Sequence, residues 1–319
     1  MVTMDLQEIY NKLELTEDKG CLIRMSDNDW EKKVNFPSRV SRLLKKNELL
    51  KTLDAFFCFD NKPLILFFNN PTDEKALHQA IWNFNESPIV IIVKNNEVEI
   101  FNGFAIDENE ERLKRLGDDK LLMDFSYYEL VTGRTWEKYK EKIDHKNRVD
   151  YRLLENIGTA QKLLKEQGLT QTTANALLGK IIFFRYLIDR KVRLNYDNKD
   201  VWGNDDLCDC LQDIVRFKTF IRHIEDKNTG FNGDMFHIDE KEFEVINQSA
   251  LNILVCLLQS VELSTGQQSL FNMYDFSILP IEFISNVYEK FIGKENQEKK
   301  SAYYTPTFLV DYIVSETVG

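Results

Sequence analysis

The chain has 319 residues, of which 43% are hydrophobic and 29% charged, so it carries enough apolar material for two ordinary domains and is neither disordered nor of low complexity. Its 52 acidic and 41 basic residues give a net charge of -11, which excludes an overall field that attracts nucleic acid or an anionic membrane. The longest apolar run, 89–93, is far shorter than the roughly 20 residues of a membrane span, and residues 1–10 lack a signal pattern, so we expect a cytoplasmic protein with no membrane partner.

The first third of the chain mixes strand and helix patterns. Short aromatic and β-branched runs predict strands, and apolar residues at helical spacing predict helices. We expect strands at 54–59, 63–68, 88–93 and 97–101 and helices at 6–15, 38–50 and 73–84. Polar residues separate the first two strands, which is typical of a hairpin. The order predicts an α/β domain over residues 1–107.

From about residue 108 the strand patterns stop and helical periods take over. We expect helices at 149–164, 174–188, 207–221, 243–258 and 279–291, joined by polar loops that include 195–206 and 262–272. The helix at 174–188 is apolar nearly all round, so it should be buried. Residues 108–293 are therefore expected to form an all-α helical bundle that connects the first domain to the C-terminal segment.

The last segment begins with a charged, poorly periodic stretch at 294–300, which indicates a linker. The helix expected after it has an apolar face formed by Leu309, Tyr312 and Ile313, with no core of its own to cover it. We therefore expect residues 294–319 to be a linker and the first helix of a domain that the chain does not complete.

The start of this last helix carries the most specific signal in the sequence. The residues there are Tyr303, Tyr304, Thr305 and Pro306. Thr305 suits the N-cap, and Pro306 suits the first helical position because its missing N–H would have no partner there. Free backbone amides and the positive end of the helix dipole favour a carboxylate or phosphate, although most capped helices bind nothing.

Residues 275–314, with DFSILPIEFISNVYEKF and YYTPTFLVDYIV, resemble the segment that leads into the S-adenosylmethionine motif of amino-methylating DNA methyltransferases. The likeness is greatest to restriction-modification enzymes in which methyltransferase and restriction functions share one polypeptide. The resemblance implies that Tyr303, Tyr304, Thr305 and Pro306 form one wall of the S-adenosylmethionine site. The glycine-rich cofactor loop and the NPPY-type tetrapeptide of the family are absent, so it implies an inactive fragment of an active parent.

The resemblance extends upstream, less sharply. Residues 175–190 are similar to a bundle helix of these enzymes, and residues 232–236 are similar to their FNGDLF loop. Taken by themselves, the apolar residues of this helix fit a protein core, whereas Arg185, Asp189 and Arg190 fit a salt-bridged helix face.

The strand order of residues 38–103 resembles the restriction-endonuclease-like domain often fused at the amino end of such enzymes, in which an Asp on one strand and a Glu-x-Lys on the next hold Mg²⁺. Asp54 occupies the first position, but Phe67 and Asn69 replace the Glu and the Lys. A phenylalanine cannot bind Mg²⁺, and an asparagine lacks the lysine charge. We therefore expect a degenerate domain with no catalytic residue and no metal, although Asp60 and Asp73 leave open a metal site rebuilt from other positions.

A local excess of basic residues lies within 32–51, where Glu48 is the acidic residue of the span. Two interpretations remain open, namely phosphate contacts to DNA and a solvated helix face. The candidates are Lys32, Lys33, Arg39, Arg42, Lys45, Lys46 and Lys51. Four aromatic residues suit either base stacking or, more commonly, a core: Trp82, Tyr127, Tyr128 and Trp136.

The cysteines are odd in number and mostly lie in apolar surroundings, which favours reduced thiols in a core. They are Cys21, Cys58, Cys208, Cys210 and Cys256. Cys208 and Cys210, with His223 and His237 downstream, do not match the spacing of structural zinc sites, so we expect no metal there.

Together these features predict the N-terminal part of a restriction-modification, site-specific DNA adenine-N6 methyltransferase. The fragment would position double-stranded DNA and link domains, and S-adenosylmethionine would belong to the full-length parent. One alternative is a non-enzymatic binding or regulatory module that contacts a specificity or restriction subunit. Another is an active Mg²⁺-dependent DNA endonuclease domain.

Overall fold

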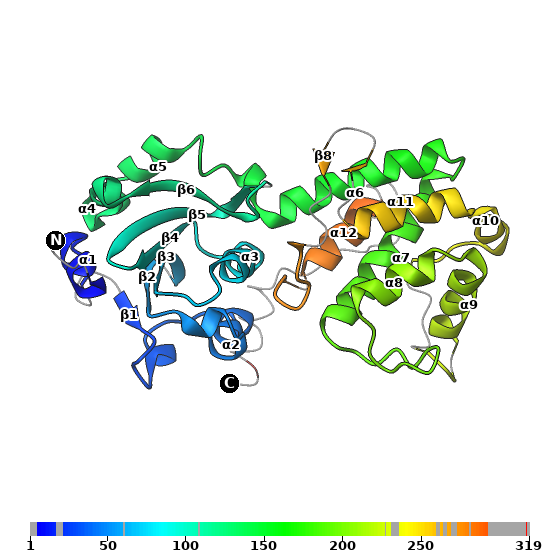
Figure 1. The fold of residues 1–319 in the computed structure, drawn as a ribbon, viewed down its shortest axis with the longest axis horizontal. Helices are drawn as coiled ribbons and strands as arrows, with labels where there is room; N and C mark the ends of the chain where they lie inside the picture. Colours follow the sequence, from blue (N-terminus) through cyan, green and yellow to red (C-terminus); the bar gives the residue numbers. More distant parts are fainter. Residues whose placement is uncertain are drawn as a thin grey trace. The chain divides into compact units, whose positions relative to one another are not determined.

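The computed structural model describes residues 5–16, 22–59, 61–107, 109–226, 228–230, 236–259, 262–263, 267–268, 273–280, 282–292 and 317. The chain divides into two compact units, Met1–Tyr151 and Arg152–Gly319 (Figure 1). Each unit buries a large set of apolar side chains of its own.

The first unit is built on a six-stranded mixed sheet whose strands follow their order in the chain. The strands are β1 (Leu22–Arg24), β2 (Ala55–Phe59), β3 (Lys62–Asn69), β4 (Ile89–Lys94), β5 (Glu97–Asp107) and β6 (Arg112–Asp118). Neighbouring strands are antiparallel except β3 and β4, which are parallel. A parallel pair needs a crossover connection, and helix α3 (Glu74–Phe84) provides it.

Helices lie on both faces of this sheet (Figure 1). One face packs on α1 (Leu6–Lys12), η4 (Asp119–Phe125), α4 (Tyr127–Val131) and α5 (Arg134–Tyr139), and buries Phe57 and Phe67. Strand residues alternate between faces, so Phe56 points the other way and lies 5.7 Å from the ring of Trp30. That second face is also covered by α3 and α2 (Ser38–Lys46).

Most of the expected elements of the first unit are confirmed. The strands expected at 54–59, 63–68 and 88–93 are β2, β3 and β4, and the helix expected at 73–84 is α3. The side chain of Asp73 caps α3 by accepting a hydrogen bond from the backbone N–H of Ala76 at 3.0 Å.

The expectation that strands stop near residue 108 is wrong. Strand β5 continues to Asp107, and β6 adds a further strand at the edge of the sheet. In β6 only Leu113 and Leu116 are buried. Most of its other residues are charged, as is common in an edge strand, so its sequence has no clear apolar strand pattern. The first compact unit extends past the boundary expected at residue 107 and ends at Tyr151.

The described part of the second unit is mainly helical. Its helices are α6 (Val149–Glu166, which begins at the end of the first unit), α7 (Gln171–Asp189), α8 (Asn204–Leu211), α9 (Ile214–Glu225), α10 (Glu240–Val245), α11 (Gln248–Leu258) and α12 (Glu282–Ile292). Helix α7 is buried along almost its whole length, as its sequence predicts. Gly168 follows α6 with a φ of 88°, the left-handed conformation that suits a glycine after a helix.

Two long helices expected in this unit are each divided in two. Asp213 starts α9 by accepting from the backbone N–H of Val215 at 2.8 Å, and Asn247 starts α11 by accepting from that of Ala250 at 2.9 Å. The polar loop expected at 262–272 contains two paired short strands, β7 (Glu262–Leu263) and β8 (Gln267–Gln268). Among the described helices, none combines the length and the apolarity that a bilayer crossing requires.

Candidate functional site

The three positions compared with a nuclease site lie close together at the start of β2 and the end of β3. The backbone N–H of Asp54 donates to the carbonyl oxygen of Phe67 at 3.0 Å. Loss of hydration raises the pKa of the Asp54 carboxyl above its usual value, and a hydrogen bond from the backbone N–H of Asn69 partly offsets this. The fold therefore places Asp54 beside the two replaced positions.

Phe67 is the position at which the sequence resemblance expects a second carboxylate. Its side chain is fully buried, and its ring contacts the edge of Tyr10, from α1, with 4.9 Å between ring centroids. Burial, with the negative charge of Asp54, raises the pKa of the Tyr10 hydroxyl well above its usual range. This side of the site is thus apolar core and offers no oxygen ligand to Mg²⁺.

The described residues do not support the alternative metal site that would use Asp60 and Asp73. The Asp73 carboxylate is used to cap α3, and Asp60 lies outside the described residues. In the described part of the chain, no group of three His, Cys, Asp or Glu side chains is placed to hold a metal ion.

The basic candidates for DNA contact fall into two groups. Four of them are held in ion pairs: Lys33 with Asp27, Arg39 with Glu86, Lys45 with Glu31, and Lys51 with Glu48. Lys32, Arg42 and Lys46 are exposed and make no ion pair with any described residue. Arg42 and Lys46 lie one turn apart on α2, so they share a face of that helix.

Three of the four aromatic candidates pack inside the first unit. Trp82 is fully buried, and its indole N–H donates to the carbonyl oxygens of Phe104 and Asn147 at 3.2 and 3.3 Å. Tyr127 and Trp136 are partly buried against the core. Tyr128 is different, because 55% of it is exposed and the guanidinium of Arg134 lies 5.2 Å from its ring centroid.

Cys208 and Cys210 are buried on α8. Burial raises the pKa of the Cys208 thiol to about 11 and that of Cys210 to about 12. Both thiols therefore stay protonated at neutral pH, as reduced cysteines of a core do.

The predicted cofactor residues Tyr303, Tyr304, Thr305 and Pro306 lie outside the described residues, as do residues 231–235 of the FNGDLF-like loop. Phe236, the last residue of that loop, is described and contacts α7. A β-carbon at Gly179 would come within 2.3 Å of the Phe236 ring, so a larger residue in this position of α7 would need the Phe236 side chain to shift. Phe236 thus packs on the helix that carried the other upstream segment of the sequence resemblance.

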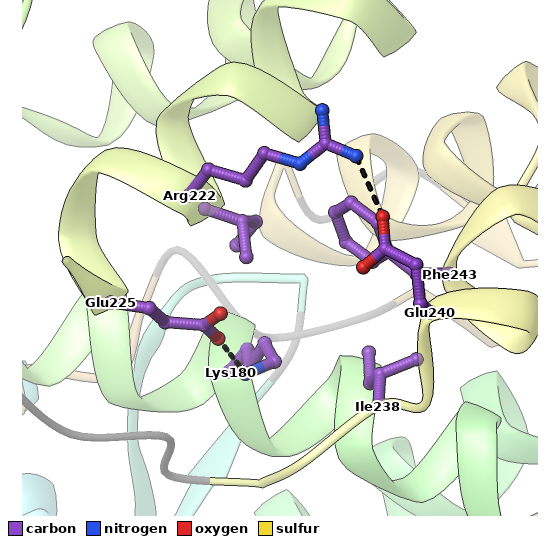
Figure 2. Close-up of a pocket in the computed structure, with 7 residues that line it drawn as sticks. Lys180, Arg222, Glu225, Ile238, Glu240 and Phe243 are labelled. Carbon is purple, nitrogen blue, oxygen red and sulfur yellow. Dashed lines mark hydrogen bonds and ion pairs between the residues drawn. The ribbon is translucent and has the colours of Figure 1, made fainter.

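A small cavity of about 40 Å³ lies where α7, α9 and α10 meet (Figure 2). It is lined by Lys180, Ile221, Arg222, Glu225, Ile238, Glu240 and Phe243. Lys180 is paired with Glu225, and Arg222 is paired with Glu240 at 2.9 Å. Its charges are therefore balanced, and its volume suits one or a few water molecules rather than a substrate.

Arg185 and Asp189 form the salt bridge that the sequence suggested, but the pair is largely buried. Their side chains are 9% and 14% exposed, and they are joined by a 2.9 Å ion pair inside the second unit. Asp189 also accepts a hydrogen bond from the backbone N–H of Phe276 at 3.0 Å. The burial has a physical reason, since a helix that is apolar on nearly every side buries the charges that it carries.

A buried charged cluster in the first unit was not predicted. Glu74 is 8% exposed and is paired with Lys94 and with Arg112, while His78, one turn along α3, is fully buried. The Nδ1 atom of His78 accepts a hydrogen bond from the backbone N–H of Leu113 in β6 at 3.1 Å. The i,i+4 spacing of Glu74 and His78 was the available signal in the sequence, but the cations come from strands that only the fold brings near.

Comparisons with protein-family models, with curated proteins and with solved structures find no match for this chain.

Proposed function

We propose that this chain is the N-terminal part of a restriction-modification DNA adenine-N6 methyltransferase. It would combine a degenerate nuclease-like α/β domain, a helical connector bundle and the start of the methyltransferase domain. In the parent, a methyl group would pass from S-adenosylmethionine to N6 of an adenine flipped out of the duplex. The cofactor assignment rests on the sequence resemblance at Tyr303–Pro306.

One structural observation carries the nuclease-like part of this proposal. An antiparallel hairpin, β2 and β3, is followed by a helical crossover to a parallel strand, β4, and Asp54 lies beside the end of β3. This arrangement suits the expected carboxylate pair, yet the buried Phe67 ring removes one of the two. The geometry therefore favours a domain that positions DNA over one that cuts it.

The DNA-positioning role is tested by salt-dependent binding. We expect the variant in which Lys32, Arg42 and Lys46 are all alanine to bind duplex DNA more weakly, because these exposed cations make no ion pair with a described residue and can contact phosphates. The slope of log K against log salt should fall by about 2 to 3, roughly one unit for each lost phosphate contact. Gel-shift titration at low and moderate salt measures both quantities.

The matched control is the variant in which Lys33, Lys45 and Lys51 are alanine. These residues are neutralised by Asp27, Glu31 and Glu48, so the salt slope should stay close to that of the unmodified chain. Equal losses in the two variants would assign the binding to general charge. Absence of DNA binding at every salt concentration would contradict DNA positioning.

A non-enzymatic binding or regulatory module is the second candidate, and the net charge of -11 favours it, since an acidic chain is a poor DNA clamp. A chain that fails to bind DNA but binds a specificity or restriction subunit would support this candidate. Plasmid cleavage with Mg²⁺ that is abolished by Asp54→Ala would instead establish an active endonuclease domain.

A further inference from the structure

Arg185 and Asp189 of α7 bind the backbone of a segment far along the chain. Asp189 uses both carboxylate oxygens, accepting from the side-chain Nε of Arg185 at 2.9 Å and from the backbone N–H of Phe276 at 3.0 Å. Arg185 also donates through Nη2 to the carbonyl oxygen of Tyr274, at a long 3.5 Å. The buried pair therefore contacts residues 273–280 through main-chain atoms, which any sequence in that segment would offer.

The same segment is held from a second helix. Tyr274 is almost fully buried, and its hydroxyl accepts a hydrogen bond from the side-chain amide of Asn156, on α6, at 3.0 Å. Phe276 in turn lies against Phe283 at the start of α12, with 6.2 Å between ring centroids. Because α12 packs on α7, fixing Tyr274 and Phe276 also fixes where α12 begins.

A buried ion pair is a costly way to stabilise a fold, because both charges lose their hydration. Burial raises the pKa of the Asp189 carboxyl, the neighbouring Asp275 raises it further, and the Arg185 guanidinium and the Phe276 N–H act in the opposite direction. Apolar residues of similar size usually stabilise a buried site as well as a buried ion pair does, without desolvating two charges. The charged pair adds what apolar residues cannot, namely a fixed position for the Phe276 N–H.

We propose that Arg185 and Asp189 are positioning residues, which hold residues 273–280 against α7 and so set the start of α12.

The latch is tested by amide exchange of the 319-residue chain. In a variant carrying both Arg185→Leu and Asp189→Leu, the buried charges are removed together, so α7 should remain folded. The Phe276 amide loses its acceptor, and its exchange should accelerate about tenfold or more, together with that of α12. Unchanged protection of Phe276 and α12 in this variant would overturn the proposal.

A matched control uses a different ion pair of α7, that of Lys180. Glu225→Gln disturbs the pair with Lys180, which joins α7 to α9 rather than to residues 273–280. Protection of Phe276 should be unaffected in this variant. Equal acceleration in the control would show that any loss of charge loosens α7, and the latch would be rejected.

A pH profile separates positioning from packing. In the unmodified chain, protection of Phe276 should fall on acidification as Asp189 becomes protonated, and at a higher pH than an ordinary aspartate allows, because the pKa of Asp189 is raised. Asp189→Asn should remove this step, whereas Asp275→Asn, which removes the neighbouring carboxylate that also faces Asp189, should keep it and move it to lower pH. Identical profiles in the unmodified chain and Asp189→Asn would contradict the latch.

Discussion

One histidine, His78 of α3, is hydrogen-bonded to β6, the last strand of the sheet in the first unit. His78 accepts the backbone N–H of Leu113 through Nδ1, so its proton is on Nε2, which is buried and lies 4.0 Å from a Glu74 oxygen. Its ring also contacts the ring of Phe101 on β5. Protonation of Nδ1 would remove the acceptor that Leu113 uses, so the neutral imidazole is the form that fits the fold.

This histidine should make the stability of the first unit depend on pH. Burial, the largest cause, and the cations Arg112 and Lys94 lower the pKa of His78 from 6.5 to about 4, although Glu74 opposes them. The unfolded chain binds the proton more readily, so the stabilisation is complete above pH 6.5 and is lost as the pH falls toward 4. The loss should amount to about 3 kcal/mol across this window.

Denaturant unfolding at several pH values across this window measures the effect. His78→Gln keeps an acceptor for Leu113 but does not titrate, so its free energy of unfolding should change less over the same range. His237→Gln is the control, because that side chain is 65% exposed. A profile that is the same in His78→Gln and in the unmodified chain would assign the acid sensitivity to other groups.

At the scale of elements, short polar side chains decide where the helices of the second unit begin. Asp213 bonds to two free N–H groups of α9, those of Val215 and Arg216. Asn247 accepts a hydrogen bond from one such group, the backbone N–H of Ala250 in α11. Apolar periodicity continues across both residues, so a periodicity argument merges each pair of helices although the backbone turns at the cap.

We expect Asp213→Ala to destabilise the second unit by about 1 kcal/mol, because two amides of α9 lose their partner. The first turn of α9 should also exchange its amides faster. Asp209→Ala is the matched control, since Asp209 is an exposed residue of α8 outside any cap, and its effect should stay within about 0.5 kcal/mol. Thermal or denaturant unfolding compares the two, and equal effects would show that the cap contributes nothing.

For the whole molecule, the division at Tyr151 and Arg152 predicts two separate responses to core mutations. Ile91 and Leu254 are fully buried, the first in the sheet and the second in α11. Ile91→Ala should destabilise the first unit by about 2 to 5 kcal/mol and leave the second protected, and Leu254→Ala should do the reverse. Hydrogen exchange by mass spectrometry reports each unit, and loss of protection in both units from one substitution would contradict two independent cores.

Local signals in the sequence were sufficient for much of the fold. The hairpin of β2 and β3, the acidic start of α3 and the buried character of α7 are determined by residues within a few positions of one another. Strand β6 was missed because its charged residues lack the apolar pattern of a strand, and its pairing with β5 depends on the rest of the sheet. The sequence was also sufficient to show that residue 67 offers no oxygen to Mg²⁺, because it is a phenylalanine and residue identity alone decides which atoms a side chain offers.

The role of a charged side chain was decided only by the tertiary structure. Whether Lys45 or Arg42 is available to DNA depends on whether a carboxylate such as Glu31 folds next to it. Arg185 and Asp189 have the i,i+4 spacing of an ordinary helix ion pair, yet they are buried against a distant segment. Arg185 contacts Tyr274, 89 residues away, and Asp189 contacts Phe276, 87 residues away. Spacing along the chain determines which face of a helix a residue occupies. Elements that are distant in the sequence determine what that face packs against. In this chain, the contact with residues 274–276 is what makes Arg185 and Asp189 positioning residues and not surface charges.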